Sequence, residues 1–426
     1  METYTPDLDP AVLGRLREYA ALFAADFPQA KPARWAGVYL HGLLTDGDRK
    51  SVEPLSRRVR LPNGLAVRDP EQALQQFLNQ SPWDQAKVLK RYRAVLAQTF
   101  ASPHGLFLFD DVSAPKQGQH SVGVQRQYCG ALGKKANCQV AVSVHYVSPW
   151  GHYPLDLRLY LPDSWLSDSR RLDQAGVPKS ERRALTKPEI ALELLDRVRA
   201  EGLPGWAVVA DAGYGVSGDF RDGLDARGLS YIVGVTEDFV VFRQEPKWEH
   251  PGTSERAGAG GRPRTRPRLA EGSPRPVALA ELVKTVRLRR VTWREGTKGK
   301  LSGRFAWLRV WPGQDWQVGG CAGKGPIWLL IEEQADGKVK YAFSNLAEGT
   351  GIKRAVRLWK SRWPVEQGYQ QMKEELGLDH FEGRSWRGFH HHAALVMLGY
   401  GFLLLERHRG QEHPAQPGKK GVPSRC

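Results

Sequence analysis

The chain has 426 residues, of which 62 are Lys or Arg and 46 are Asp or Glu, so its formal net charge is +16. An apolar content of 41% and 14 tryptophans exclude a disordered basic protein, and the length predicts two or three folded units. A strongly basic surface predicts a polyanion as the partner.

Cysteine spacing and the length of the apolar stretches indicate the cellular compartment. The cysteines are Cys129, Cys138, Cys321 and Cys426, and no two of them form a C-x-x-C motif. We therefore expect free thiols in a reducing compartment. Residues 1–10 are acidic and polar, unlike a secretory leader, and the longest apolar stretch, Ala393 to Leu405, is too short to span a bilayer. A cytoplasmic protein without a membrane partner is the prediction.

Residues 1–103 are expected to form a helical N-terminal domain with a DNA-binding role. Apolar residues at helical spacing predict helices over Val12–Phe27 and Arg34–Leu44. A third helix is predicted to start with Ser81 as N-cap and Pro82 in its first position. Its basic side chains, which either contact phosphates or are simply solvated, are Lys87, Lys90, Arg91 and Arg93.

From Gly105 onward the pattern changes to short apolar runs typical of strands. Five strands are predicted, at 106–109, 140–147, 155–161, 206–210 and 231–235. A Gly-rich basic loop, Lys116 to Lys135, separates the first two strands and contains Arg126. A helix over Lys187–Ala200, with Thr186 as N-cap, precedes the fourth strand.

The order of these elements predicts an α/β fold with an RNase H-like mixed sheet. Three consecutive strands followed by helix, strand, helix and strand argue against a plain doubly wound sheet. Asp110 follows the first strand and Asp211 follows the fourth. These two strands are neighbours in an RNase H-like sheet, so the two carboxylates are expected to meet.

A basic β-rich insertion is predicted to interrupt this core. The first core part is 104–236, the insertion is 237–340, the second core part is 341–409, and 410–426 is a disordered basic tail. Between Arg243 and Arg309 there are 17 Lys or Arg and 6 Asp or Glu, a net charge of +11. Within it Gly252–Pro276 is expected to be a flexible loop. Strands are predicted at 304–311, 327–332 and 341–346, and a core helix at 389–408.

The second core part contains the stretch W-K-S-R-W-P-V-E-Q-G-Y-Q-Q-M-K, residues 359–373. Glu366 and Lys373 are seven residues apart, close to two helical turns, so they share one helix face. Pro364 is expected to restart the helix, which places Glu366 in the first turn, where the helix dipole favours a carboxylate.

Together these motifs resemble the DDE-type insertion-sequence transposases, in particular the cut-and-paste group with the signature Tyr, two residues, Arg, three residues, Glu, six residues, Lys. Its gaps match Trp359, Arg362, Glu366 and Lys373. The block Ala-Asp-Ala-Gly-Tyr around Asp211 and the insertion before the glutamate helix also fit. The resemblance covers residues 105–407, about 70% of the chain.

The resemblance implies a transposase that cleaves DNA at transposon ends and transfers the strands into target DNA, with a DNA hairpin as one excision route. Asp110, Asp211 and Glu366 would be the catalytic residues and would hold two Mg²⁺ or Mn²⁺ ions. Double-stranded DNA, at the transposon ends and the target, would be the partner of a dimer on the nucleoid of a bacterium. The side chains expected to contact DNA are Arg362, Lys373, Trp359, Trp293 and Arg126. In such transposases an aromatic at the place of Trp293 stacks on a flipped base; a core tryptophan is the alternative.

Two departures from the signature leave alternatives open. Trp359 stands where the signature has tyrosine, so a hydroxyl is lost. Asp111 directly follows Asp110 and would point to the opposite sheet face. We prefer Asp110 as the first acid because it directly follows the apolar run. A hydrolytic RNase H-like nuclease and a transposase-derived DNA-binding protein without activity are the competing functions.

Overall fold

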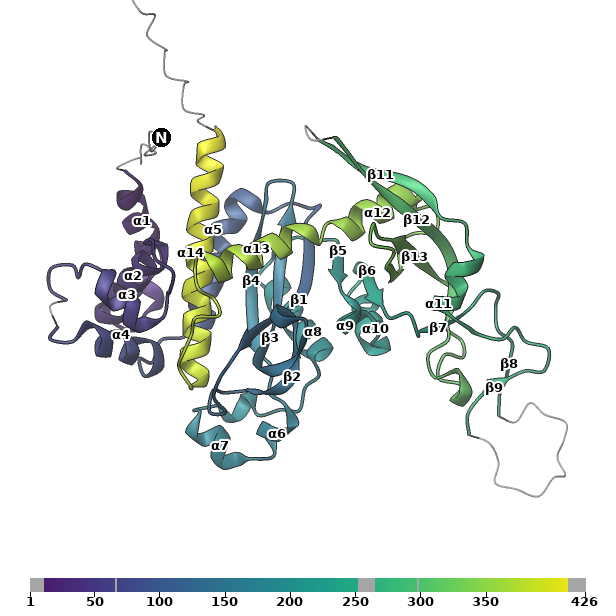
Figure 1. Cartoon of the computed structure of the whole chain (residues 1–426), viewed down its shortest axis with the longest axis horizontal. Helices are drawn as coiled ribbons and strands as arrows, with labels where there is room; N and C mark the ends of the chain where they lie inside the picture. The colour runs from purple at the N-terminus through teal and green to yellow at the C-terminus, as the bar shows by residue number, and fades with distance from the viewer. Residues whose placement is uncertain (1–10, 66, 252–264, 297–298, 413–426) are drawn as a thin grey trace, which may run out of the picture.

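The computed structural model describes residues 11–65, 67–251, 265–296 and 299–412. Figure 1 shows helices at the N-terminus, a central sheet, and an inserted β unit on the far side of the sheet. The long yellow helix α14 (Trp386–Glu412) runs between the N-terminal helices and the sheet. One hydrophobic core extends from Leu16 in the N-terminal helices through the sheet to Leu404 in α14. Because this core crosses the predicted boundary between residues 103 and 104, the division of the chain into separate domains stays a prediction.

The N-terminal region is helical, as the sequence predicts. Its helices are α1 (Val12–Ala21), α2 (Ala30–Leu44), α3 (Val52–Arg58), α4 (Pro70–Asn79) and α5 (Gln85–Phe100). The predicted start of α5 at Ser81 is wrong. Asp84 is the N-cap and accepts a hydrogen bond from the backbone N–H of Ala86 at 2.9 Å. The buried Trp83 stacks on His391, with ring centroids 3.7 Å apart, and this contact keeps the preceding residues out of the helix.

The central sheet has the predicted RNase H-like order. Its strands are β1 (Leu106–Pro115), β2 (Gln125–Cys129), β3 (Lys134–Ser148), β4 (Gly151–Leu159), β5 (Ala207–Ala210) and β6 (Ser230–Val235). β3 pairs antiparallel with β1 and β4, while β5 pairs parallel with both β1 and β6. The spatial order is therefore β4-β3-β1-β5-β6, and the first and fourth predicted strands are neighbours. The α/β fold class with a mixed sheet is confirmed.

Helices on the faces of the sheet follow the connections. They are α6 (Asp163–Leu166), α7 (Ser169–Gln174), α8 (Lys187–Ala200), α9 (Ala212–Gly215) and α10 (Gly218–Ala226). α8 has the predicted bounds because Thr186 and Glu189 form a capping box. By contrast, the predicted loop at 116–135 is wrong in part, since β2 lies within it. β2 has few apolar residues and is held by antiparallel pairing with β3, which the sequence pattern does not reveal.

The inserted unit extends the same sheet. Its strands are β7 (Val240–Phe242), β8 (Trp248–Glu249), β9 (Arg268–Leu269), β10 (Val277–Ala278), β11 (Arg289–Gly296), β12 (Gly299–Pro312), β13 (Ile327–Glu333) and β14 (Val339–Ser344), with the short helix α11 (Leu279–Leu282). β14 pairs antiparallel with β6, so the insertion and the core share hydrogen bonds. Most of the expected flexible loop, 252–264, lies outside the described residues; the rest of it contains β9.

Three helices close the chain. They are α12 (Ile352–Lys360), α13 (Trp363–Glu374) and α14, and Pro364 lies in the first turn of α13, as predicted. Among the described residues, Trp386–Gln411 in α14 is long and apolar enough to cross a membrane, but 89% of its apolar window is buried inside the protein. This burial confirms the prediction of a core helix. The predicted tail from Gly410 lies mostly outside the described residues. Cys129, Cys138 and Cys321 are free thiols, as expected.

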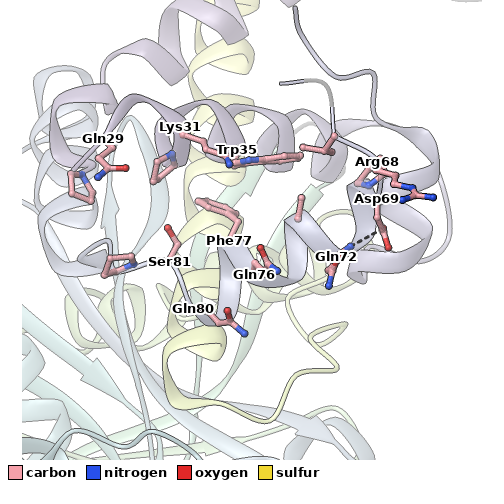
Figure 2. Close-up of a pocket in the computed structure, with 16 residues that line it drawn as sticks. Gln29, Lys31, Trp35, Arg68, Asp69, Gln72, Gln76, Phe77, Gln80 and Ser81 are labelled. Carbon is pink, nitrogen blue, oxygen red and sulfur yellow. Dashed lines mark hydrogen bonds between the residues drawn. The ribbon is translucent and has the colours of Figure 1, made fainter. Parts of the chain in front are cut away.

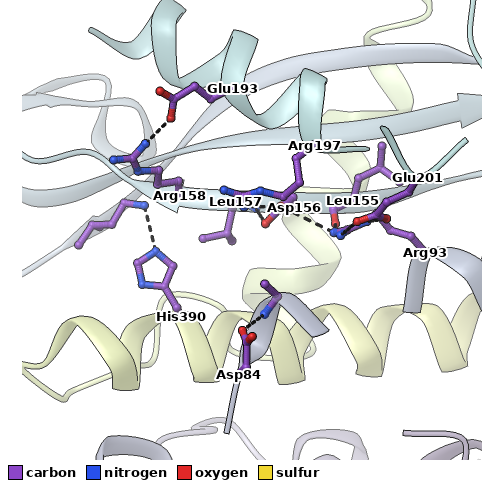
Figure 3. A network of polar contacts seen from close by, with 12 residues as sticks. Asp84, Arg93, Leu155, Asp156, Leu157, Arg158, Glu193, Arg197, Glu201 and His390 are labelled. Carbon is purple, nitrogen blue, oxygen red and sulfur yellow. Dashed lines mark hydrogen bonds and ion pairs between the residues drawn. The ribbon is translucent and has the colours of Figure 1, made fainter. Parts of the chain in front are cut away.

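A buried ionic network joins the N-terminal helices to the sheet (Figure 3). Arg93 on α5 is 3% exposed and donates to both carboxylate oxygens of Glu201 at 2.6 Å. Asp156 on β4 accepts from Arg197 on α8 at 2.8 Å. Because Arg93 is taken up in this network, it is not available as one of the phosphate contacts considered for α5. A buried charge that loses its partner is costly, so this network fixes how α5 sits on the sheet.

Candidate active site

Strand pairing brings the two aspartates to the same edge of the sheet. The parallel register of β1 and β5 pairs Phe109 with Ala210, so Asp110 and Asp211 occupy the next position on each strand. β5 ends there, and Asp211 becomes the N-cap of α9, where its carboxylate accepts from the N–H of Gly213 at 2.9 Å. β1 continues past Asp110, because Asp110 remains paired with Ser143 on β3.

Burial and neighbouring carboxylates raise the pKa of both aspartates. Burial raises the pKa of Asp110 to about 7, with the charge of Asp211 adding to the rise and Arg362 opposing it. Burial likewise raises the pKa of Asp211, and Arg362 again opposes the rise. An additional positive charge near the two aspartates would therefore stabilise their carboxylate forms.

Arg362 links the helix of the signature to this pair. It is the residue before the first turn of α13, and its Nη2 lies 4.0 Å from Oδ2 of Asp110. Its guanidinium carbon also lies 5.6 Å from the ring centroid of Trp359, a cation–π distance. The predicted contact surface for phosphate is thus next to the acids.

Tyr369 anchors α13 over the sheet, a role that the signature does not reveal. Its hydroxyl forms a hydrogen bond with the hydroxyl of Ser143, the cross-strand partner of Asp110. Its ring lies 4.6 Å from that of His145, and the side chain is buried. The signal in the sequence that could have indicated this role is that Tyr369 follows Glu366 by three residues, which is a helical spacing. This contact sets how far α13 stands from Asp110.

Asp111 has partners of its own. It accepts a hydrogen bond from the hydroxyl of Tyr214 at 2.6 Å and forms an ion pair with Lys187 at 2.5 Å. Tyr214 belongs to the block around Asp211, which gives that tyrosine a structural reason to be there. In contrast, the carboxylate of Asp110 accepts a hydrogen bond from the neighbouring N–H of Asp111 at 2.8 Å.

Glu366 lies in the first turn of α13, as predicted, and is exposed. It lines an open cavity of about 710 Å³ together with Arg362, Trp363 and Trp293. Within the described parts of the chain, no three His, Cys, Asp or Glu side chains are grouped closely enough to hold a metal ion. The two aspartates are therefore together, but the expected convergence with Glu366 is not formed in this structure. Repulsion among three carboxylates and the position of Arg362 between helix and sheet give a physical reason.

The tryptophans predicted to contact DNA differ in exposure. Trp293 on β11 is partly buried, contacts Phe305 edge-on at 5.8 Å, and has Nζ of Lys360 at 5.0 Å from its ring. Trp359 is 5% exposed and donates its indole N–H to Glu332 at 2.7 Å. Trp359 therefore contacts protein in this structure, and its DNA contact stays a prediction.

Lys373 and Arg126, the remaining predicted DNA contacts, lie on different elements. Lys373 is half-buried in the last turn of α13. Arg126 is exposed on β2.

A larger cavity of about 990 Å³ lies between α2 and α4, with Trp35 and Phe77 among its lining residues (Figure 2). None of the predicted site residues lines it.

An RNase H-like sheet with two half-buried aspartates at one edge and a basic residue facing them defines a nuclease-type α/β protein. Residues 22–300 match the family described as DDE superfamily endonuclease. The match covers more than half of the chain, which therefore belongs to this family.

One curated relative is the probable transposase for insertion sequence element IS701 of Microchaete diplosiphon. The two are 32% identical over 226 residues, 53% of this chain and 54% of the relative. The chain thus matches about half of that relative's length.

Two solved structures show weaker similarity. The piggyBac transposase synaptic complex with hairpin DNA has a TM-score of 0.45 at 12% identity, covering 97% of this chain and 70% of that one. The NurA nuclease from Sulfolobus solfataricus has a TM-score of 0.29 at 9% identity, covering 67% and 86%. With both TM-scores below 0.5, these similarities carry no argument about this chain.

Proposed function

We propose that this chain is a DNA transposase that cleaves DNA at the ends of an insertion sequence and joins those ends to target DNA. The observation that carries the proposal is the parallel pairing of β1 and β5, which sets Asp110 beside Asp211 opposite Arg362. Family membership and the IS701 relative, itself named a probable transposase, support the same activity.

Endonucleases of this superfamily generally use divalent metal ions. The donor set fits a hard cation, because Asp110, Asp211 and Glu366 offer carboxylate oxygens, and burial together with repulsion leaves Asp110 short of positive charge. Two Mg²⁺ or Mn²⁺ ions are proposed there. When bound, they would stabilise charge on the attacking and leaving oxygens of the phosphodiester. Assembly of the site requires α13 to bring Glu366 toward the aspartates.

The basic residues of α13 would hold the DNA backbone. Arg362 offers a planar guanidinium for a bidentate contact with a phosphate, and Lys373 offers a point charge on the same helix. Arg362 already lies at the aspartate pair, so a phosphate that it binds would be next to the acids. Because joining requires two transposon ends, at least two copies of the chain are proposed in the DNA complex.

Excision through a DNA hairpin is the finer proposal, and Trp293 is the residue that would serve it. Trp293, Arg362 and Glu366 line the same cavity. An aromatic ring in the cavity with Glu366 can stack on an unpaired base, and Lys360 and Arg294 provide cations close by.

Two alternatives need the same fold. A hydrolytic nuclease would cut DNA with the same acids but form no joined product. A non-catalytic DNA-binding descendant of a transposase would bind DNA without cutting it, and the presence of all three acids in the sequence speaks against it.

The test is incubation of the purified chain with DNA carrying the ends of its own element, target DNA and Mg²⁺, followed by analysis of the products. Cleaved ends joined to target DNA are expected, and Glu366→Gln, which keeps the size but removes the charge, should yield neither. Cleaved but unjoined DNA would identify the hydrolytic nuclease. Bound, uncut DNA with both the wild type and the variant would identify the non-catalytic protein.

A further inference from the structure

The sequence between Asp111 and Asp156 contains no acidic residue. This stretch, 112–155, has 44 residues, where the average of 46 Asp or Glu in 426 residues would place about five. Its lysines and arginines are Lys116, Arg126, Lys134 and Lys135. Lys116 bonds the backbone carbonyl of Phe381, so it is used inside the protein. The other three lie on the β2–β3 ribbon, residues 125–138, and are exposed.

The outer face of the β2–β3 ribbon presents an aromatic ring between two cations. Arg126 pairs with Asn137 across the strands, and Tyr128 pairs directly with Lys135, so these four side chains share one face. Tyr128 is 62% exposed. Asn137 is held inward by the carbonyls of Lys116 and Gly118. No ion pair within the described residues engages Arg126 or Lys135.

The register places this face on the same side of the sheet as the first acid. Asp110 pairs with Ser143, and the pairing of β1 with β3 runs without a shift down to Pro115 and Cys138. Since side chains alternate, Asp110 and Ser143 share a face with Asn137 and Lys135 on β3, and hence with Arg126 and Tyr128. Along β3, Ser143 beside Asp110 is six residues from Asn137 and eight from Lys135. At ~3.3 Å per residue, the ribbon face therefore lies about 20–26 Å from Asp110.

We propose that Arg126, Tyr128 and Lys135 form a contact surface for duplex DNA that grips the backbone about 6–8 base pairs from the phosphate being cut. The spacing follows from ~3.4 Å per base pair, and the placement relative to the cut rests on the proposed function. A polyanion is favoured because two cations flank the ring on a ribbon without carboxylates. The tyrosine hydroxyl can donate to a phosphate, and both cations can release counterions on binding.

The first test measures the affinity of the full chain for a duplex carrying the element's end and its flank at several salt concentrations. Arg126→Ala/Lys135→Ala should lower the slope of log affinity against log salt by about 1.8, since each phosphate contact contributes ~0.9. Arg183→Ala/Arg409→Ala removes the same charge from exposed positions before α8 and on α14, outside the N-terminal helices and the insertion, and should leave the slope unchanged. Equal slopes in the ribbon variant and this control would overturn the proposal.

The second test reads the position of the contact. A photoreactive p-benzoylphenylalanine replacing Tyr128 should crosslink to DNA about 6–8 base pairs from the cut, whereas the same replacement of Trp150 should not. Trp150 is also 62% exposed but lies at the opposite end of β3. Crosslinks from position 128 to a second copy of the chain, with DNA affinity unchanged, would show a protein interface instead. If the wild type never cleaves DNA but the salt slope still falls in the ribbon variant, the proposed function fails and the DNA surface stands.

Discussion

Asp110 and Asp211 are separated by 101 residues, yet they occupy equivalent positions at the ends of the paired segments of β1 and β5. Burial raises the pKa of both side chains, and Arg362 opposes the rise in each case. The sheet therefore holds two carboxyl groups in a setting that favours an incoming cation. Asp111, one residue away, forms an ion pair with Lys187 instead.

This difference predicts distinct outcomes for amide substitutions at the two adjacent aspartates. Asp110→Asn should abolish cleavage while leaving DNA affinity nearly unchanged, because the substitution leaves the cations that bind phosphate in place. Asp111→Asn should keep cleavage and lower the free energy of unfolding by about 1 kcal/mol through the partly exposed Lys187 contact. Cleavage assays and denaturant melts of both variants check this. An inactive Asp111→Asn beside an active Asp110→Asn would move the first acid by one residue.

The strand order and the start of α13 could be predicted from the sequence because local signals determine them. Apolar runs mark β1, β5 and β6, Thr186 and Glu189 cap α8, and Pro364 restarts the helix. β2 could not be predicted, since it is held by pairing with β3 rather than by apolar alternation. The start of α5 was misplaced because burial of Trp83 outweighs the local preference of Ser81 and Pro82 for a helix start.

Trp293 gives a prediction that separates a DNA contact from core packing. If the ring stacks on an unpaired base, Trp293→Ala should lower the yield of hairpin ends, and Trp293→Phe should keep part of it because an aromatic face remains. The ring also contacts Phe305, so thermal melts must accompany the assay. A lower melting temperature with full hairpin yield would assign Trp293 to packing alone.

The positive charge of the insertion predicts strong salt dependence of DNA binding. Deleting 243–309 would remove β11 and most of β12, and β12 pairs with β13 in the sheet, so side-chain substitutions are the better test. Replacing the exposed side chains of Arg289, Arg290 and Arg294 by Ala should instead lower the slope of log affinity against log salt by about 2–3. Anisotropy titrations measure it. An unchanged slope would place the phosphate contacts outside β11.

The helix spacing within the candidate site could be predicted from the sequence, but the distances between its side chains could not. The spacing of Arg362, Glu366 and Lys373 follows from helix geometry, and Arg362 does lie at Asp110. The position of Glu366 depends on how Tyr369 seats α13 on Ser143, a tertiary contact without a local signal. The burial of Trp359 against Glu332 also depends on a tertiary contact, because it requires β13 to lie beside α12.

Buried neutral histidines predict a loss of stability in mild acid. Burial lowers the pKa of His390 and His392 to about 4 each. In its neutral form the ring of His390 can donate from Nδ1 to the carbonyl of Trp386 at 2.9 Å and accept at Nε2 from the N–H of Leu159. His392 can likewise donate to Gly377 and accept from Tyr39. Both side chains therefore have their partners without a proton.

An unfolded histidine has a pKa near 6.5, above the folded value, so the unfolded state binds more protons between about pH 6.5 and 4. The stability contributed by these neutral histidines should be fully present above pH 6.5. Below that pH the free energy of unfolding should fall by about 1.4 kcal/mol per pH unit for each such histidine. His390→Gln keeps a donor and an acceptor but does not titrate, so it should flatten this fall. His120→Gln, at an exposed position, is the matched control and should leave it unchanged. Denaturant melts from pH 7 to 4 measure the slope, and identical slopes in the wild type and His390→Gln would mean that the pKa of His390 is the same in the folded and unfolded states.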